Sequence, residues 1–175
     1  DLINREPLSE KYIFTYGGGA EFIKNIKRYC LWLKDLNPNE LKLMPIVKEK
    51  IDGVRDFRFS SDREATKKLA EYPTLFGEDR QPKNNYILIP KVSSETRQYI
   101  PLGFLNKSHI ANGSSMIVEN ATLFEFGILT SLMHMSWIKY TCGRMKSDYQ
   151  YSNTIVYNNY PFPKNVSEKQ KKAVE

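Results

Sequence analysis

The sequence is poor in the residues on which small metal-bound or disulfide-bonded domains depend. It has two cysteines, Cys30 and Cys142, each inside an apolar stretch, and two histidines, His109 and His134. None of these residues has a second Cys or His nearby at zinc-ligand spacing, which argues against a zinc site. With nine Gly and nine Pro in 175 residues, collagen-like and low-complexity classes are excluded. We therefore expect a globular chain in which both cysteines are small core residues.

Long hydrophobic runs are also missing. The longest uncharged apolar stretch lies between Glu125 and Lys139, which is shorter than the roughly 20 residues of a membrane-spanning helix. No secretory signal peptide opens the chain. Four Asn-x-Ser/Thr triplets would be glycosylated in a secreted protein. Together with the free cysteines, these features predict a cytoplasmic protein that makes no membrane contact.

The composition indicates one domain with a real core and a basic surface. The chain is 41% hydrophobic and 13% aromatic, and its 26 Lys and Arg against 20 Asp and Glu give a net charge of +6. A basic balance favours a polyanionic partner, although many basic domains bind no nucleic acid. Charge alone therefore leaves a protein-interaction domain open as an alternative.

Catalytic motifs are scarce. There is no H-E-x-x-H, G-x-S-x-G or Walker sequence, and the glycines at 17–19 lack the Lys-Ser/Thr of a phosphate loop, so they indicate a tight turn. Asp35 and Glu40 with Lys42 resemble the carboxylates and lysine of a Mg²⁺-dependent nuclease, but they flank a predicted loop and a helix start. A small nuclease using Asp35 and Glu40 is the enzyme alternative. The segment 158–162 has Asn, Tyr and Pro in the wrong order for a methyltransferase catalytic loop, and we interpret it as a structural turn.

The periodicity predicts an α+β domain in which a mixed, mostly antiparallel sheet packs against several helices. Strands are expected at 12–14, 28–33, 86–89 and 99–105, and two more joined by a hairpin at Asn112-Gly113. Pro38 and Pro45 each fit the first position of a helix. A capping box at 61–64 predicts a third helix that ends near 72–73.

Two helices receive specific core assignments. In the helix beginning at Pro45, an apolar stripe recurs at three- and four-residue spacing, formed by Val47, Ile51, Val54 and Phe57. The segment 123–142 is apolar almost all round and predicts one long buried helix ended by Gly143. Leu129, Met133 and Trp137 are expected to be buried on it.

Basic and polar residues concentrate in four clusters, at 24–28, 80–85, 91–98 and 144–150. Arg, Lys, Ser, Asn and Gln are the residue types that bond to phosphates and base edges. Ordinary solvated loops have the same composition, so the clusters alone do not decide the function.

Six segments in order resemble a known family: FGEDRQP (76–82), YILIPKVSSE (86–95), YIPLGFL (99–105), FGILTSLMHM (126–135), GRMKSDYQYS (143–152) and YNNYP (157–161). The sequence is similar to the target recognition domain of MmeI-like (type IIG/IIL) restriction–modification proteins. Those proteins combine an endonuclease, an adenine-specific DNA methyltransferase and a DNA recognition domain in one chain. The resemblance runs from about residue 12 to residue 163.

The resemblance implies a fragment that binds double-stranded DNA and catalyses nothing. The family's S-adenosylmethionine loop, catalytic Asn-Pro-Pro loop and nuclease lie upstream of this domain and are not in this sequence. We therefore expect no cofactor and no metal in this chain, S-adenosylmethionine and Mg²⁺ in the parent protein, and the upstream methyltransferase domain as a partner. The expected organisation is a linker at 1–11, the recognition domain at 12–163, and the start of a C-terminal helical region at 164–175.

The resemblance also directs attention to the Gly-Arg-x-x-Ser-x-Tyr element. The two positions that flank its Ser are associated with base-pair reading in the family, and here they are Lys146 and Asp148 in place of the Glu and Arg of relatives. If the backbone is extended there, both side chains leave one face, with Cα atoms about 6.5–7 Å apart. The residues expected to contact DNA phosphates or the groove are Arg80, Lys91, Ser93, Ser94, Arg97 and Arg144.

Overall fold

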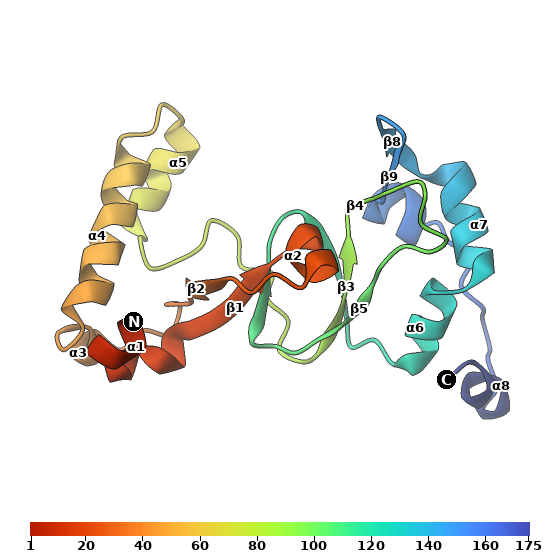
Figure 1. The fold of residues 1–175 in the computed structure, drawn as a ribbon, viewed down its shortest axis with the longest axis horizontal. Coiled ribbons are helices and arrows are strands. Elements are labelled where there is room, and N and C mark those ends of the chain that lie inside the picture. The colour runs from red at the N-terminus through yellow and green to blue at the C-terminus, as the bar shows by residue number, and fades with distance from the viewer. The chain divides into compact units, whose positions relative to one another are not determined.

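The computed structural model describes all 175 residues and divides into two compact units. Unit 1 comprises residues 1–15 and 29–80, and unit 2 comprises residues 16–28 and 81–175. Both contain helices and short strands, which confirms the predicted α+β class (Figure 1). None of the helices combines the length and apolar character that crossing a bilayer requires.

Unit 1 is mainly helical around a small core. Its strands β1 (Ile13–Gly17, of which the first three residues belong to this unit) and β2 (Tyr29–Leu31) pair antiparallel. Its core consists of Tyr12, Leu33, Met44, Val47 and Ile51. The helices are α1 (Leu2–Arg5), α3 (Pro38–Leu41), α4 (Pro45–Phe59) and α5 (Glu64–Lys68), with 3-10 turns at Pro7–Tyr12 and Leu69–Glu71.

The helix starts of unit 1 show which sequence signals decided the local structure. Asn37 caps α3 by accepting from the Asn39 N–H at 2.9 Å, as predicted. At the start of α4 the buried carboxylate of Glu6 accepts from the N–H groups of Ile46 and Val47, at 2.5 and 3.1 Å. The polar first segment therefore supplies a cap that α4 does not have in its own sequence.

Two details predicted for unit 1 are wrong. The expected capping box at 61–64 does not form, because α5 begins at Glu64 after Arg63, which makes no side-chain cap. On α4, Val47 and Ile51 are buried, but Val54 and Phe57 are 38% and 76% exposed. The apolar stripe therefore meets the core only over the first half of the helix.

Unit 2 is built on a three-stranded antiparallel sheet in the order β5-β3-β7. The strands are β3 (Tyr86–Pro90), β5 (Gly103–Leu105) and β7 (Ser115–Glu119). Every residue of β3 is buried, as expected for a continuous apolar run in the middle of a sheet. Ile87 and Ile89 join Leu129, Met135 and Ile138 in one core.

A second antiparallel sheet in unit 2 has the order β4-β9-β8, with β4 (Val92–Ser93), β8 (Gly143–Met145) and β9 (Asp148–Gln150). The predicted hairpin at Asn112-Gly113 is wrong. The short strands on its two sides, β6 (His109–Ala111) and β7, belong to different sheets, and the Asn112 N–H donates to the Gly17 carbonyl at 2.8 Å.

The single long helix predicted at 123–142 is divided in the structure into α6 (Leu123–Leu129) and α7 (Leu132–Thr141). The break occurs at Ser131, whose backbone is extended and whose hydroxyl accepts from the His134 N–H at 3.1 Å. Restarting the helix changes which side faces the core. Leu129 is buried as predicted and Trp137 is half-buried, but Met133 is 66% exposed.

Two further helices complete unit 2: α2 (Gly19–Lys24) and α8 (Glu168–Val174). A π-helical turn at Asn153–Tyr157 leads into an aromatic-proline segment. Tyr160 of that segment stacks on His134 with ring centroids 4.6 Å apart, and the Asn159 amide donates to the Thr154 and Ile155 carbonyls. The segment 158–162 is therefore the structural turn that the sequence indicated.

Candidate nucleic-acid interface

The recognition element suggested by the sequence is a β-hairpin. In the register of β8 and β9, Met145 lies opposite Asp148, so Lys146 and Ser147 form a two-residue turn. Lys146 has φ of 58°, a left-handed conformation usually taken by Gly at the first position of such turns. The assumption of an extended backbone from 146 to 148 is therefore wrong: Lys146 is at the tip of the hairpin and Asp148 begins the returning strand.

The base of the hairpin is held by Arg144. Its guanidinium lies 4.0 Å from the centroid of the Tyr149 ring, and it donates to the Ser147 carbonyl at 3.0 Å. Tyr149 is itself buried in the core of unit 2. Arg144 is thus part of the hairpin's own support and is an exposed residue.

Asp148 connects the hairpin to the loop that follows β4. One carboxylate oxygen of Asp148 accepts from the Glu95 N–H at 3.3 Å. In the same loop the Ser94 hydroxyl bonds to Thr96 and the Ser94 carbonyl accepts from the Arg97 N–H. This compact turn leaves the Arg97 side chain exposed and without a side-chain partner. The Glu95 contact was not foreseen, because a backbone donor has no sequence signature.

Lys91 lies at the junction between β3 and β4 and is already bonded. Its ammonium donates to the Gly113 carbonyl at 2.6 Å, its N–H donates to the Ser114 carbonyl, and its carbonyl accepts from the Tyr151 N–H. A phosphate contact by Lys91 would therefore share its ammonium with the 112–114 turn.

Ser93 is 3% exposed, and its hydroxyl has no hydrogen-bond partner. Its backbone pairs with Tyr149. In this structure Ser93 supports the hairpin sheet from within, and contact with DNA would require its hydroxyl to be uncovered. Arg80 belongs to unit 1, where it is an exposed residue paired with Glu78 at 2.9 Å.

The glycines at 17–19 make room for the protein's own chain. A Cβ on Gly18 would overlap Asn112 Oδ1 and Ser114 Oγ, and the Gly19 N–H donates to the same Ser114 hydroxyl at 3.3 Å. Gly18 also donates its N–H to Glu21, which with Arg28 lowers the pKa of that carboxyl to about 2. The space is filled, so this turn does not fit the phosphates of a cofactor.

The carboxylates of the nuclease alternative, Asp35 and Glu40, do not belong to a metal-binding group of three or more side chains. Glu40 accepts from Lys11 Nζ at 2.7 Å and from the Tyr12 hydroxyl at 2.8 Å, and these bonds lower its pKa. No group of three His, Cys, Asp or Glu side chains is placed to hold a metal ion. The structure thus offers no support for hydrolysis at Asp35 and Glu40.

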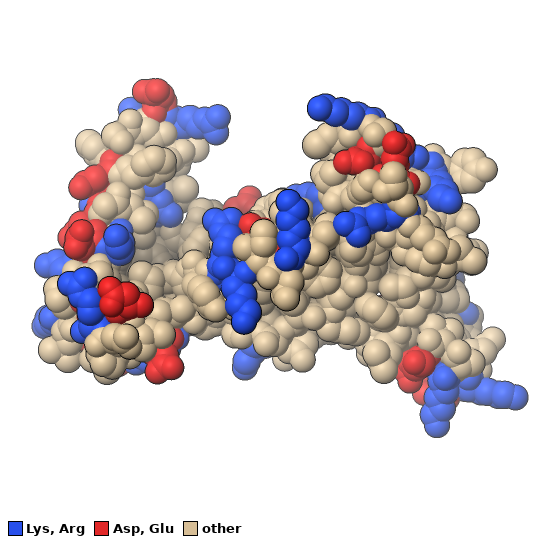
Figure 2. Space-filling model, in the orientation of Figure 1, with Lys and Arg blue, Asp and Glu red and all other residues tan.

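Charged side chains of both signs lie together over the part of unit 2 that carries β4, β8 and β9 (Figure 2). Lys146, Arg97 and Arg144 supply donors there, and Asp148 supplies acceptors. An antiparallel sheet thus presents a hairpin with exposed donors and acceptors, a surface whose chemistry suits a polar partner.

Comparison with known proteins identifies the module. Residues 1–164 match the family described as "MmeI, target recognition domain", and the chain belongs to this family. It is 37% identical over all 175 residues to the protein named "DNA methyltransferase A" of Bacillus subtilis (strain 168), of which it covers 20%.

A solved structure agrees with this assignment. The chain is similar, with a TM-score of 0.90 and 41% identity over 98% of its length, to the type IIL restriction-modification enzyme MmeI, whose structure was determined in complex with DNA. It covers 23% of that chain. The sequence thus spans about a fifth to a quarter of the length of these two relatives.

Proposed function

We propose that this chain is the sequence-specific double-stranded DNA recognition module of a bifunctional restriction endonuclease and adenine-specific DNA methyltransferase. The observation that carries the proposal is the β8–β9 hairpin, which presents Lys146 at its tip within a domain of the MmeI recognition family. The major groove of B-DNA admits a two-stranded β-ribbon, and each base pair shows a distinct donor and acceptor pattern there.

Lys146 and Asp148 are the proposed base readers. An ammonium has only donors and an ionised carboxylate only acceptors, so Lys146 suits the O6 and N7 atoms of G and Asp148 suits the amino group of C. One Asp148 oxygen accepts from the Glu95 N–H, which fixes the carboxylate and leaves its other oxygen for the base. The pair would read one G·C base pair.

The proposed backbone contacts are Arg97, Ser94 and Arg144 around the hairpin, with Lys91 behind it and Arg80 from unit 1. Arg97 is the clearest phosphate ligand, because it is exposed and its loop is fixed by the Ser94 turn. Ser93, being buried, acts by holding β4 against β9.

Catalysis is assigned to other parts of the parent protein. There, S-adenosylmethionine would supply the methyl group and Mg²⁺ would assist cleavage, while this chain supplies recognition and a docking surface for the methyltransferase domain. The turn at 17–19 is filled by the protein's own side chains, and the segment 158–162 forms a structural turn. We also place the parent protein in the cytoplasm.

Two measurements on the 175-residue chain test the proposal. Selection from a randomised duplex library should enrich one motif, and the logarithm of the binding constant should fall linearly with the logarithm of salt concentration, since phosphate contacts release counterions. Binding without salt dependence would favour a protein-interaction domain instead.

The second measurement is an activity assay. The chain should neither transfer methyl groups from S-adenosylmethionine nor cleave DNA with Mg²⁺. Either activity, if abolished by Asp35→Ala or Glu40→Ala, would make the chain an enzyme and overturn the assignment.

A further inference from the structure

A second polar site lies at the opposite end of the β5-β3-β7 sheet from the hairpin. Tyr86, the first residue of β3, pairs with Leu105 of β5 and Glu119 of β7. Because β5 and β7 both run antiparallel to β3, the segment before β3 and the segments after β5 and β7 meet at the same end of the sheet. They form an open hollow of about 530 Å³, lined by Lys83, Asn84, Asn85, Lys107, Asn120 and Ala121.

The chemistry of this hollow is suited to an anion. Its polar side chains are lysines and asparagines, and no carboxylate lines it. Neither Lys83 nor Lys107 forms an ion pair. An anion in the hollow would be attracted by two ammonium groups that no carboxylate neutralises.

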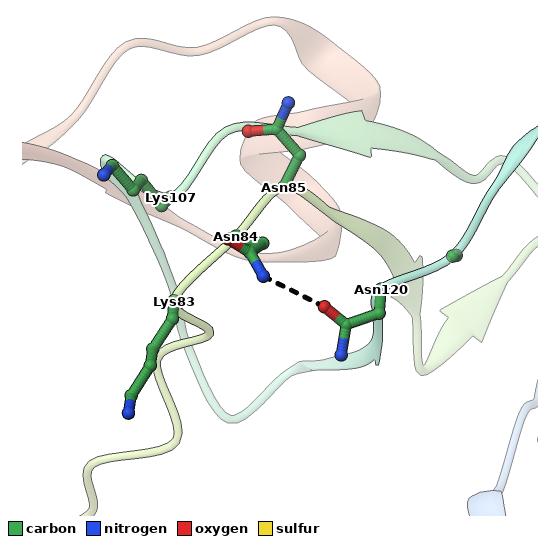
Figure 3. Close-up of a pocket in the computed structure, with 6 residues that line it drawn as sticks. Lys83, Asn84, Asn85, Lys107 and Asn120 are labelled. Carbon is green, nitrogen blue, oxygen red and sulfur yellow. Dashed lines mark hydrogen bonds between the residues drawn. The ribbon is translucent and has the colours of Figure 1, made fainter.

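The asparagines hold the hollow in shape. Asn84 donates to Asn120 Oδ1 at 3.1 Å, and Asn120 has φ of 55°. Figure 3 shows this bond between the segment before β3, which also carries Lys83, and the segment after β7, with the Asn120 amide nitrogen turned away from Asn84. Lys107 is fixed through its carbonyl, which accepts from Gln81 at 2.9 Å. These bonds hold the backbone that carries the lysines, and an anion need not break them.

We infer that this hollow is a second DNA contact of the recognition domain, which takes a backbone phosphate outside the base pairs read by the hairpin. The inference rests on the proposed function. From Tyr86 to Ser93, where β4 joins the hairpin sheet, the chain spans at most about 23 Å at 3.3 Å per residue. The phosphates of one DNA strand rise by about 3.4 Å per base pair along the helix axis, so the span from Tyr86 to Ser93 corresponds to about seven base pairs.

The test compares two variants that each lose two positive charges. The first variant, Lys83→Gln/Lys107→Gln, removes the two positive charges that line the hollow. The control variant, Lys169→Gln/Lys172→Gln, removes two positive charges from exposed positions on α8. Each is measured on two duplexes that contain the sequence selected above, one with flanks of about three base pairs and one with flanks of about ten.

On the long duplex the Lys83/Lys107 variant should bind about 3- to 10-fold more weakly, and the magnitude of its salt slope should fall by about one for each phosphate that the variant no longer binds. On the short duplex it should match the α8 control. Asn120→Asp, which places a carboxylate in the hollow, should also weaken binding to the long duplex only. If both hollow variants match the control on both duplexes, the inference is overturned.

A further experiment distinguishes binding of a DNA backbone phosphate from binding of a free anion. Inorganic phosphate is titrated while the side-chain amide signals of Asn84 and Asn120 are followed by NMR. Saturation below about 1 mM, with no effect of the variants on the long duplex, would make the hollow a site for free anions and contradict the backbone contact. Absence of salt-dependent DNA binding by the wild-type chain would contradict the proposed function itself, and the DNA contact at the hollow with it.

Discussion

At the scale of single residues, His134 is the most unusual group in unit 2. It is fully buried; its Nε2 lies 3.1 Å from the Tyr151 hydroxyl, and its Nδ1 has no partner. The rings that face it belong to Tyr151 and Tyr160, and no carboxylate is among them. Burial lowers the pKa of His134 to about 4.

This predicts acid sensitivity of the fold. The unfolded chain binds a proton at His134 near pH 6.5, whereas the folded chain does so only near pH 4, so stability should fall as pH drops through this interval. We expect the free energy of unfolding by urea to fall by about 3 kcal/mol between pH 7 and pH 4.

His134→Gln should flatten the unfolding profile between pH 6.5 and 4, while His109→Gln at the other histidine should leave most of the slope in place. A profile of unchanged slope in His134→Gln would show that this group is not responsible. Glu21, whose pKa is lowered from 4.5 to about 2, loses its contribution as the pH falls from about 4.5 towards 2, so it overlaps only the acidic end of this interval.

Gly18 gives a second prediction at the residue scale. A Cβ there would overlap Asn112 Oδ1 and Ser114 Oγ, so Gly18→Ala should displace the 112–114 turn and cost about 1–3 kcal/mol. Gly113→Ala is the matched control, since a Cβ at that position meets nothing within 4 Å. Thermal unfolding compares the two, and equal stabilities would contradict the close packing at Gly18.

At the scale of elements, the sequence foresaw what strong local signals determine. Asn37 before Pro38, Pro45 at a helix start, and the apolar run 86–89 all form the elements expected of them. The break at Ser131 was missed because the surrounding residues are apolar on both sides, although Ser131 is itself a good N-cap. The left-handed Lys146 could not be foreseen, since a non-glycine residue there carries no signal.

The break between α6 and α7 separates a core position from an exposed one. Leu129 is 3% exposed and Met133 66% exposed. Leu129→Ala should therefore cost about 2–5 kcal/mol, whereas Met133→Ala should cost less than about 0.5 kcal/mol. Urea unfolding measures the stability of both variants. A large loss of stability in Met133→Ala would support the single buried helix predicted from the sequence and contradict the break.

At the scale of the whole molecule, the division into two units and the contacts of the candidate site were not predictable from local sequence patterns. Contacts divide the chain into two compact units, a property that depends on long-range packing and has no signature in composition. The resemblance directed attention to residues 144–148, which form a hairpin. It did not show that Ser93 is buried or that Lys91 is bonded to Gly113, because both depend on tertiary contacts.

Arg97 tests the electrostatic part of DNA binding. Since its side chain is exposed and unpaired, Arg97→Ala should weaken binding to all duplex sequences alike and reduce the magnitude of the salt slope by about one. Arg63→Ala, an exposed arginine of unit 1, is the control for removal of one positive charge. Weakening confined to the selected sequence would instead make Arg97 a base reader.

The central claim is that the β8–β9 hairpin reads DNA sequence through Lys146 and Asp148. The most direct measurement is library selection with Lys146→Glu/Asp148→Arg beside the wild-type chain, repeated in the parent enzyme by mapping its methylated sites. We predict that one G·C pair of the motif reverses to C·G, with the new Arg on G and the new Glu on C, at a discrimination of about 1–3 kcal/mol per contact. Retained binding and activity with an unchanged motif would contradict the claim.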